Sequence, residues 1–182
     1  MKTVDRILQR WRMRRAIAFL PDPVRLIDVG AFHGELFEAL GPRLAEGFGL
    51  EPLLTGRRTG RHYTIEPGFF PQCRPDHGGW NAVTLLAVLE HIPRKEQAAL
   101  ADACHGLLAP GGRVIITVPG RAVDTLLAIL KFLRLIDGMS LEEHYGFEPK
   151  DTAAIFAAPR FRLLHQSRFQ LGLNHLFVFE KQ

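Results

Sequence analysis

A strand that runs into a glycine-bearing loop constrains this chain more than any other feature. Residues 25–34 read RLIDVGAFHG, an apolar run that ends in Asp28-Val-Gly30, and a helical pattern follows over residues 35–40. Glu51 ends the next apolar run, seventeen residues after this segment. In open α/β sheets, ligands bind outside the carboxyl ends of the strands, where an acidic residue after the second strand accepts hydrogen bonds from ribose hydroxyls. The pattern therefore predicts a nucleoside-binding site.

The spacing of the glycines separates two kinds of nucleoside ligand. A dinucleotide fingerprint would place glycines at positions 30, 32 and 35, where this chain has Gly30, Phe32 and Glu35. Glu35 in the first helical turn suits the helix dipole, but it would repel a phosphate bound there. The spacing disfavours a nicotinamide-dependent oxidoreductase and favours a ligand without phosphate, such as S-adenosylmethionine.

Four segments in order resemble the motifs of the class I S-adenosylmethionine-dependent methyltransferases. The resemblance covers residues 24–120 by motif and the rest by layout. Its segments are Asp28 to Gly34, Gly49 to Glu51, Val83 to Ile92 and Leu107 to Val114. Phe32 departs from the family pattern, which has its middle glycine at this position. The resemblance implies an α/β fold of the Rossmann-like, doubly wound kind, with S-adenosylmethionine as the cofactor.

The resemblance also implies a set of cofactor-binding residues. Asp28 would hold the glycine loop or receive the cofactor's amino group, and Glu51 would bind the ribose. Leu86 and Ala87 would line the methionine side, and Phe69 would lie near the adenine. The full expected set is Asp28, Gly30, Ala31, Phe32, Gly34, Glu51, Pro52, Gly68, Phe69, Leu86 and Ala87.

Purely structural roles are the alternative for several of these residues. Asp28 would then only cap the turn that follows it, and Glu51 would be a solvent-facing acid in a loop. Adjacent phenylalanines such as Phe69 and Phe70 are often core residues, so either one stacks on the adenine or both belong to the core.

A histidine and an acid follow the fourth predicted strand, close to where an acceptor would meet the methyl group. Methyl transfer is an in-line displacement that depends on positioning, and a base is needed only when the nucleophile must lose a proton. His91 is the candidate general base, because a neutral imidazole takes a proton near neutral pH, and Glu90 would orient it. The alternative is that both residues only cap a helix that starts at Pro93.

No metal is expected at this place. Quinone O-methyltransferases that resemble the chain carry Glu-x-x-Glu-His here, which holds a divalent metal, but position 87 is Ala87. The Asn-Pro-Pro-Tyr or Asp-Pro-Pro-Tyr motif of the nitrogen-methylating branches is also missing from residues 86–89. Structural hydrogen bonds are expected for His144 and His175.

Length and composition predict one domain over residues 1–182, with a core at 24–182 and a helix at 1–20. An apolar content of 47% supports a sizeable core, and the longest apolar runs are too short to span a bilayer. A secretory signal is not expected, and the only cysteines, Cys73 and Cys104, lack metal or redox spacing. These features predict a cytoplasmic protein.

Basic residues crowd the first fifteen positions, although the net charge of the chain is only +4. Val4, Ile7, Leu8 and Trp11 recur at helical spacing, which predicts an amphipathic helix with a basic outer face. Two interpretations stand: peripheral contact with an anionic membrane surface, or a solvated face on a helix that covers the core or the active site. A mitochondrial transit peptide is less favoured, because the stretch lacks serine.

The order of the predicted elements indicates a mainly parallel sheet with helices on both faces. Strands are expected at residues 25–29, 47–50, 63–65, 82–86 and 113–118, and a C-terminal antiparallel hairpin at 161–171 and 173–180. The crossover between the second and third strands is expected to be a loop rich in glycine and arginine. A helix over residues 121–136 is apolar almost all round.

Together these observations predict methyl transfer from S-adenosylmethionine to oxygen or carbon of a small, partly apolar acceptor. The alternative is a nonenzymatic protein of the same fold that binds S-adenosylmethionine or acts through a partner. Nucleic acid is not an expected partner, because no basic surface interleaved with aromatic residues and no zinc spacing accompany the arginines. The oligomeric state and the acceptor are left open.

Overall fold

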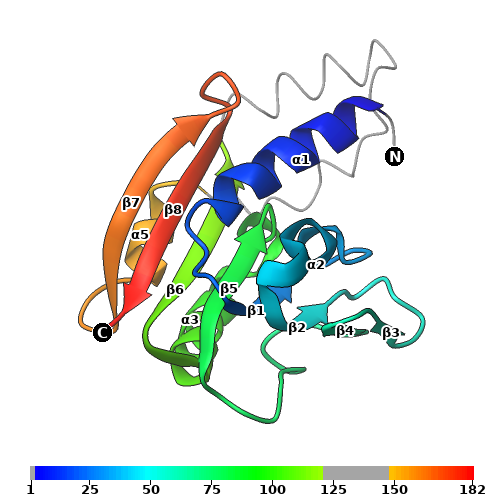
Figure 1. Cartoon of the computed structure of the whole chain (residues 1–182). Helices are drawn as coiled ribbons and strands as arrows, with labels where there is room; N and C mark the ends of the chain where they lie inside the picture. Colours follow the sequence, from blue (N-terminus) through cyan, green and yellow to red (C-terminus); the bar gives the residue numbers. More distant parts are fainter. Residues whose placement is uncertain (1–2, 121–147) are drawn as a thin grey trace.

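The computed structural model describes residues 3–120 and 148–182, which form a single eight-stranded sheet with helices on both faces (Figure 1). The order of the strands is β3-β4-β2-β1-β5-β6-β8-β7. Their bounds are Val24–Val29 (β1), Leu44–Leu50 (β2), Arg58–Thr59 (β3), Tyr63–Glu66 (β4), Trp80–Leu86 (β5), Leu108–Pro119 (β6), Phe161–Phe169 (β7) and Asn174–Lys181 (β8). The predicted helix at 121–136 and the residues His144 and Tyr145 lie outside the described residues.

The sheet is parallel at its centre and antiparallel at both edges. Strands β4, β2, β1, β5 and β6 pair in parallel, and β8 then pairs antiparallel with both β6 and β7. This arrangement confirms the predicted Rossmann-like fold with a C-terminal antiparallel hairpin. The crossover from β2 to β4 contains no helix, as predicted, but it does include the two-residue strand β3, which pairs antiparallel with β4.

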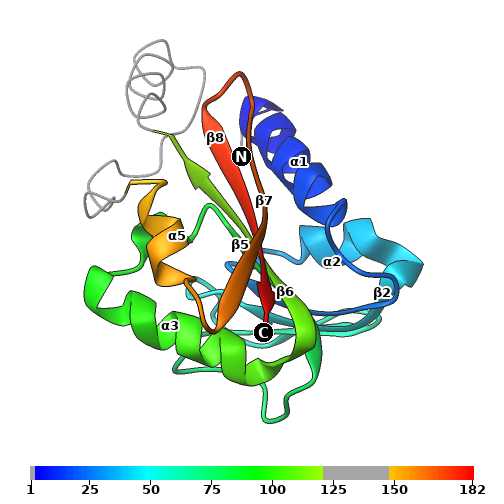
Figure 2. The same cartoon turned by 90° about the vertical axis from the view of Figure 1, so that its left-hand side faces the viewer.

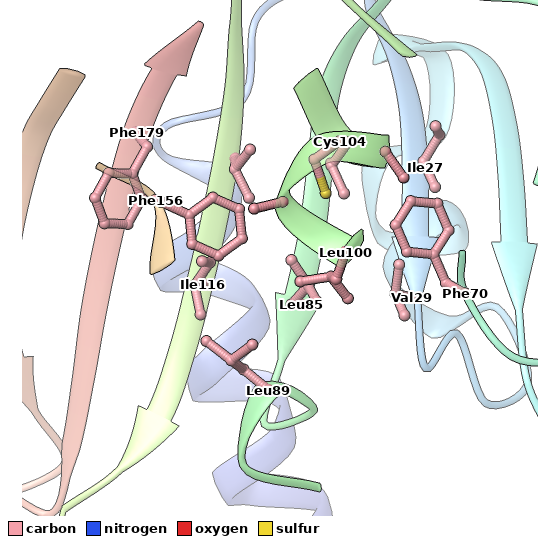
Figure 3. Packing of buried hydrophobic residues seen from close by; sticks show 14 of the residues in the cluster. Ile27, Val29, Phe70, Leu85, Leu89, Leu100, Cys104, Ile116, Phe156 and Phe179 are labelled. Atoms are coloured by element: carbon pink, nitrogen blue, oxygen red, sulfur yellow. The ribbon is translucent and has the colours of Figure 1, made fainter. Parts of the chain in front are cut away.

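Helices cover both faces of the sheet (Figure 2). Their bounds are Thr3–Ile17 (α1), Glu35–Leu40 (α2), Arg94–Leu107 (α3) and Asp151–Ile155 (α5), with 3₁₀ turns at Gly41–Arg43 (η1) and Leu89–His91 (η2). Side chains alternate along β1: Leu26 packs in the cluster beneath α1 and α2, and Ile27 packs in the cluster beneath α3. Figure 3 shows the second cluster, in which Leu100 and Cys104 of α3 lie over the sheet. Both faces of the central strands are therefore buried, as in other parallel sheets.

Helix α1 packs across the sheet by its inner side. Ala16 and Leu20 are buried against the sheet, and the guanidinium of Arg113 in β6 donates a hydrogen bond of 2.8 Å to the carbonyl oxygen of Phe19. The amide of Gln170, at the tip of the β7–β8 hairpin, donates to the carbonyl oxygen of Leu8 at 2.8 Å. None of the described helices combines the length and apolar character needed to cross a membrane.

The end of α3 differs from the prediction. The sequence predicts a strand from residue 113, but β6 already begins at Leu108, before the Pro-Gly-Gly segment at residues 110–112. Leu108 pairs with Trp80, and the next pair joins Arg113 to Ala82, so this segment is a bulge within the strand. At its start, α3 begins at Arg94 with Pro93 as the N-cap residue, one position later than predicted.

Candidate cofactor-binding site

The loop after β1 is tied to the end of β2 by backbone hydrogen bonds. The amides of Gly30 and Ala31 both donate to the carbonyl oxygen of Leu50, at 2.8 and 3.0 Å. Gly30 and Gly34 have φ angles of 78° and 91°, which L-residues rarely adopt. A side chain at position 30 would also meet Val88, since an added Cβ would lie 2.6 Å from its Cγ2. The chain therefore requires glycine here for both conformation and space.

Phe32 occupies a conformation that glycine usually takes. Its φ angle is 50°, and its ring lies 4.1 Å from the ring of His33, measured between centroids. The loop thus follows the glycine-type path even though the side chain is large.

The carboxylate of Glu51 fastens this loop. Its Oε2 accepts a hydrogen bond from the amide of Phe32 at 3.0 Å, and its Oε1 accepts one from the amide of Leu53 at 3.1 Å. The side chain is buried, which rules out the alternative of a solvent-facing loop acid. Each carboxylate oxygen has further acceptor capacity, so Glu51 can bind a hydroxyl while it holds the loop.

Asp28 is buried at the end of β1. Its Oδ1 accepts a hydrogen bond of 2.6 Å from the hydroxyl of Thr84 in the neighbouring strand β5. Burial raises the pKa of Asp28 to about 7, and the negative charges of Glu35 and Glu51 also raise it, while the Thr84 hydrogen bond acts in the opposite direction. The carboxyl group is thus held in an environment that disfavours its charge unless a cation is near.

A cavity lies over the carboxyl ends of β1 and β5, beneath α1. It brings together five of the predicted cofactor residues, from two segments: Asp28, Gly30, Ala31, Phe32 and Leu86. The remaining lining residues, which the sequence interpretation did not include, are Gln9, Arg12, Met13, Glu35 and Leu36. Helix α1 therefore covers the candidate site as well as the core.

Arg12 is the most important residue that the sequence interpretation missed. Burial lowers the pKa of its guanidinium, and the charge of Glu90 partly offsets that effect. Its Nε is buried with no hydrogen-bond partner within the described residues. The one signal in the sequence was spacing: Leu8, Arg12 and Ala16 lie four residues apart, on the inner side of the helix.

Six predicted cofactor residues do not line this cavity: Gly34, Glu51, Pro52, Gly68, Phe69 and Ala87. Pro52 and Phe69 are exposed, and Gly68 follows β4, whose end is joined to β2 by a hydrogen bond from the amide of Glu51 to the carbonyl oxygen of Glu66. Ala87 lies past the end of β5 with a φ angle of 60°. Gly34 is likewise absent from the lining and instead begins α2 as its N-cap.

The two adjacent phenylalanines have different environments. Phe70 is buried in the α3-side core beside Val29 (Figure 3), so it is not available to stack on a ligand. Phe69 is 67% exposed, next to the carboxyl end of β4. Of the two, only Phe69 remains a candidate for contact with an adenine.

His91 and Glu90 form the turn η2 after β5. The amide of His91 donates to the carbonyl oxygen of Val88 at 2.9 Å, and the His91 side chain is partly exposed. Glu90 is buried and lies close enough to Arg12 to influence its pKa. Glu90 thus lies near a residue of the cavity lining, although neither Glu90 nor His91 lines the cavity itself. Within residues 3–120 and 148–182, no three His, Cys, Asp or Glu side chains are grouped as metal ligands.

Comparison with known proteins identifies the family. A profile described as a methyltransferase domain matches residues 2–170. The chain belongs to the class I S-adenosylmethionine-dependent methyltransferases. A ubiquinone biosynthesis O-methyltransferase of Psychrobacter arcticus is 30% identical over 128 residues, which cover 62% of this chain and 49% of that protein. The chain therefore spans about half the length of the curated relatives that it matches.

Solved methyltransferase structures share the fold. Magnesium protoporphyrin IX methyltransferase from Synechocystis, solved with bound SAH, has a TM-score of 0.62 and 19% identity, covering 99% of this chain and 82% of that one. The Burkholderia thailandensis 1,6-didemethyltoxoflavin-N1-methyltransferase, solved with S-adenosylhomocysteine, has a TM-score of 0.68 and 17% identity, covering 95% and 77%. S-adenosylmethionine is the cofactor of this methyltransferase family.

Proposed function

We propose that this methyltransferase moves the methyl group of S-adenosylmethionine to oxygen or carbon of a small, partly apolar acceptor. The observation that carries the proposal is the cavity under α1. A carboxyl group, Asp28, and a guanidinium group, Arg12, both line it, beside Gly30 of the loop after β1. No nicotinamide fingerprint or phosphate seat accompanies these groups in the sequence.

The described residues fit the cofactor in charge. The Asp28 carboxylate suits the ammonium group of the methionine moiety, and the unpartnered Nε of Arg12 suits its carboxylate. Glu51 has acceptor capacity for ribose hydroxyls, and the bare backbone at Gly30 permits close approach. Pro52, Gly68 and Phe69 would flank the adenine.

The cofactor supplies an electrophilic methyl group on a sulfonium, and the chain's own residues position the acceptor and handle the proton. For a hydroxyl acceptor, His91 takes the hydroxyl proton as the methyl–sulfur bond breaks and the methyl–oxygen bond forms. Glu90, buried beside Arg12, is a positioning residue that holds the guanidinium over the cavity. Met13, Leu36 and Leu86 give the cavity an apolar side.

Two observations support a hydroxyl on a partly apolar acceptor. Curated relatives carry the name ubiquinone biosynthesis O-methyltransferase, at about 30% identity over roughly half of their length. Apolar side chains of Met13, Phe32 and Leu86 lie beside charged ones in the cavity lining, which suits an acceptor that is only partly apolar. Together with a histidine after β5, these observations favour oxygen over carbon as the atom that receives the methyl group.

Cofactor binding is tested by thermal unfolding with S-adenosylmethionine, S-adenosylhomocysteine or NAD. At about 100 times the dissociation constant, each sulfur nucleoside should stabilise the fold by about 2.7 kcal/mol, whereas NAD should give no shift. Glu51→Gln should weaken S-adenosylhomocysteine about tenfold, because an amide replaces an acceptor oxygen of the carboxylate. Glu96→Gln, at a partly exposed position of α3, is the matched control. No shift with either sulfur nucleoside would favour the nonenzymatic alternative.

The proton-transfer role predicts that His91→Gln lowers kcat about a hundredfold on the first hydroxyl acceptor that the wild type methylates. Affinity for S-adenosylhomocysteine should stay within twofold, since His91 does not line the cavity. The acid limb of the pH profile should disappear with the imidazole. A control substitution is His62→Gln, at an exposed position. An unchanged kcat and pH profile would remove His91 from the reaction.

A further inference from the structure

We propose that the outer side of α1 docks on an anionic lipid membrane. Along this helix the side chains of Ile7 and Trp11 are 56% and 40% exposed to solvent, although large apolar side chains are usually buried. Four arginines are exposed on the same side: Arg6, Arg10, Arg14 and Arg15. The inner side of the helix is occupied by the sheet and the cavity, so among residues 3–120 and 148–182 it is the outer side that is exposed.

The helical spacing gives this surface its order. At 3.6 residues per turn, Ile7 and Trp11 lie within an arc of about 40°. Arg10 and Arg14 lie on one flank of that stripe and Arg15 on the other. An apolar stripe bordered by arginines is the arrangement of helices that lie in the plane of a membrane interface, with the apolar groups in the acyl boundary and the guanidinium groups at the phosphates.

A second exposed apolar side chain lies beside α1. Leu171, at the tip of the β7–β8 hairpin, is 95% exposed. The neighbouring Gln170 donates its side-chain hydrogen bond to Leu8, which holds this tip against the helix, and both views show the two segments side by side (Figures 1 and 2). The apolar part of the surface therefore includes two separate elements of the fold.

Charge and composition together favour lipid over nucleic acid. The first twenty residues hold six basic residues and one acid, which attracts either polyanion. However, Ile7 and Trp11 would gain nothing from a phosphate backbone, whereas the interfacial region of a bilayer accepts both. The cavity lies on the other side of the same helix, within about 10–12 Å of such a membrane. On the proposed function, this would let a partly apolar acceptor reach the site from the lipid.

The proposal predicts binding to vesicles of phosphatidylcholine with about 30% phosphatidylglycerol, and little binding to phosphatidylcholine alone. Arg10→Gln together with Arg14→Gln should reduce the partition coefficient about thirtyfold, at roughly a factor of five for each arginine near the surface. The matched control is Arg61→Gln with Arg74→Gln, two exposed arginines outside α1. Ile7→Ser with Trp11→Ser should also release the protein from the vesicles, because these are the apolar side chains that the outer side of α1 exposes.

Trp11 provides a readout that aggregation does not imitate. The other tryptophan, Trp80, is 1% exposed, so quenching by lipids brominated along the acyl chain reports on Trp11. Equal vesicle binding by the helix variant and the Arg61/Arg74 control would overturn the proposal, as would tighter binding to duplex DNA or tRNA than to vesicles at the same salt concentration. Vesicle binding is measured without cofactor, so its failure is separate from a failure of the thermal shift with S-adenosylhomocysteine.

Discussion

Asp28→Asn is expected to raise the free energy of unfolding at pH 8 by about 3 kcal/mol and to weaken S-adenosylmethionine binding at the same time. The pKa of Asp28 is about 7 in the folded protein, against an ordinary value of 3.8, because the carboxyl group is buried. A shift of about three units corresponds to about 4 kcal/mol of folding free energy. Burying the new amide donors takes back about 1 kcal/mol of that gain, and the amide oxygen can still accept the Thr84 hydrogen bond.

The pH dependence follows from the direction of this shift. A carboxyl group whose pKa is raised by folding favours the folded state fully below about pH 4, and this contribution is lost as the pH rises through 7. Urea unfolding from pH 4 to 8 should therefore show the difference between variant and wild type growing across that window. Asp76→Asn, at an exposed position, should stay within about 0.5 kcal/mol of wild type throughout. Parallel curves for wild type and Asp28→Asn would contradict the assignment.

This prediction links instability to function. In the wild type, the ammonium group of the cofactor is the cation that Asp28 lacks, so binding should strengthen as the pH rises through 7 and the carboxyl group loses its proton. Isothermal titration with S-adenosylhomocysteine at pH 6 and pH 8 measures this. Asp28→Asn should bind weakly at both values, because it has no charge to offer. A residue that destabilises the fold and holds a ligand is common at functional sites.

Much of the site could be predicted from sequence because its signals are local. Asp28, Gly30 and Ala31 lie in one short segment, and the alternation of strands and helices places that segment next to the start of the β5–α3 connection. Glu51 follows from the same logic, since β2 pairs in parallel with β1 and their carboxyl ends meet. The C-terminal hairpin could also be predicted, because two apolar runs meet at Gly172.

Arg12 could not be predicted, because its role depends on where α1 packs. The sequence predicts a basic helix, but the first fifteen residues contain five other basic side chains, and the sequence does not tell which of the six faces the cavity. Only the contact of α1 with β5 and β6 selects the side that faces inward. Glu90 shows a related limit: its place next to His91 predicts that it orients the imidazole, but nothing in the sequence predicts that it lies buried near Arg12.

Phe69 and Phe70 show why a local pattern leaves alternatives open. Both are phenylalanines in the same short segment after β4, so nothing in the local sequence tells which one is buried in the core and which one is exposed. The structure separates them through the path of the loop, which turns Phe70 onto Val29 and Leu100 and leaves Phe69 outside (Figure 3). Only tertiary packing decides such a pair.

Gly30→Ala is expected to destabilise the fold by about 3 kcal/mol and to abolish cofactor binding. A φ angle of 78° costs an L-residue about 1–2 kcal/mol. The added Cβ would lie 2.6 Å from Cγ2 of Val88, and because valine is stiff at χ1, relief of this clash adds about 1–3 kcal/mol. The Cβ would also stand where the chain approaches the ligand.

A second glycine separates the two causes of this destabilisation. Gly111 has a φ angle of 74°, close to that of Gly30, but an added Cβ there would have no atom within 4 Å. Gly111→Ala should therefore cost only the conformational part, about 1 kcal/mol. In a double-mutant cycle, Val88→Ala should recover about 2 kcal/mol of the Gly30→Ala penalty, because it removes the methyl group that clashes. If Gly30→Ala and Gly111→Ala lose equal stability, the close approach of the β1 loop to the residues after β5 is not what requires glycine at position 30.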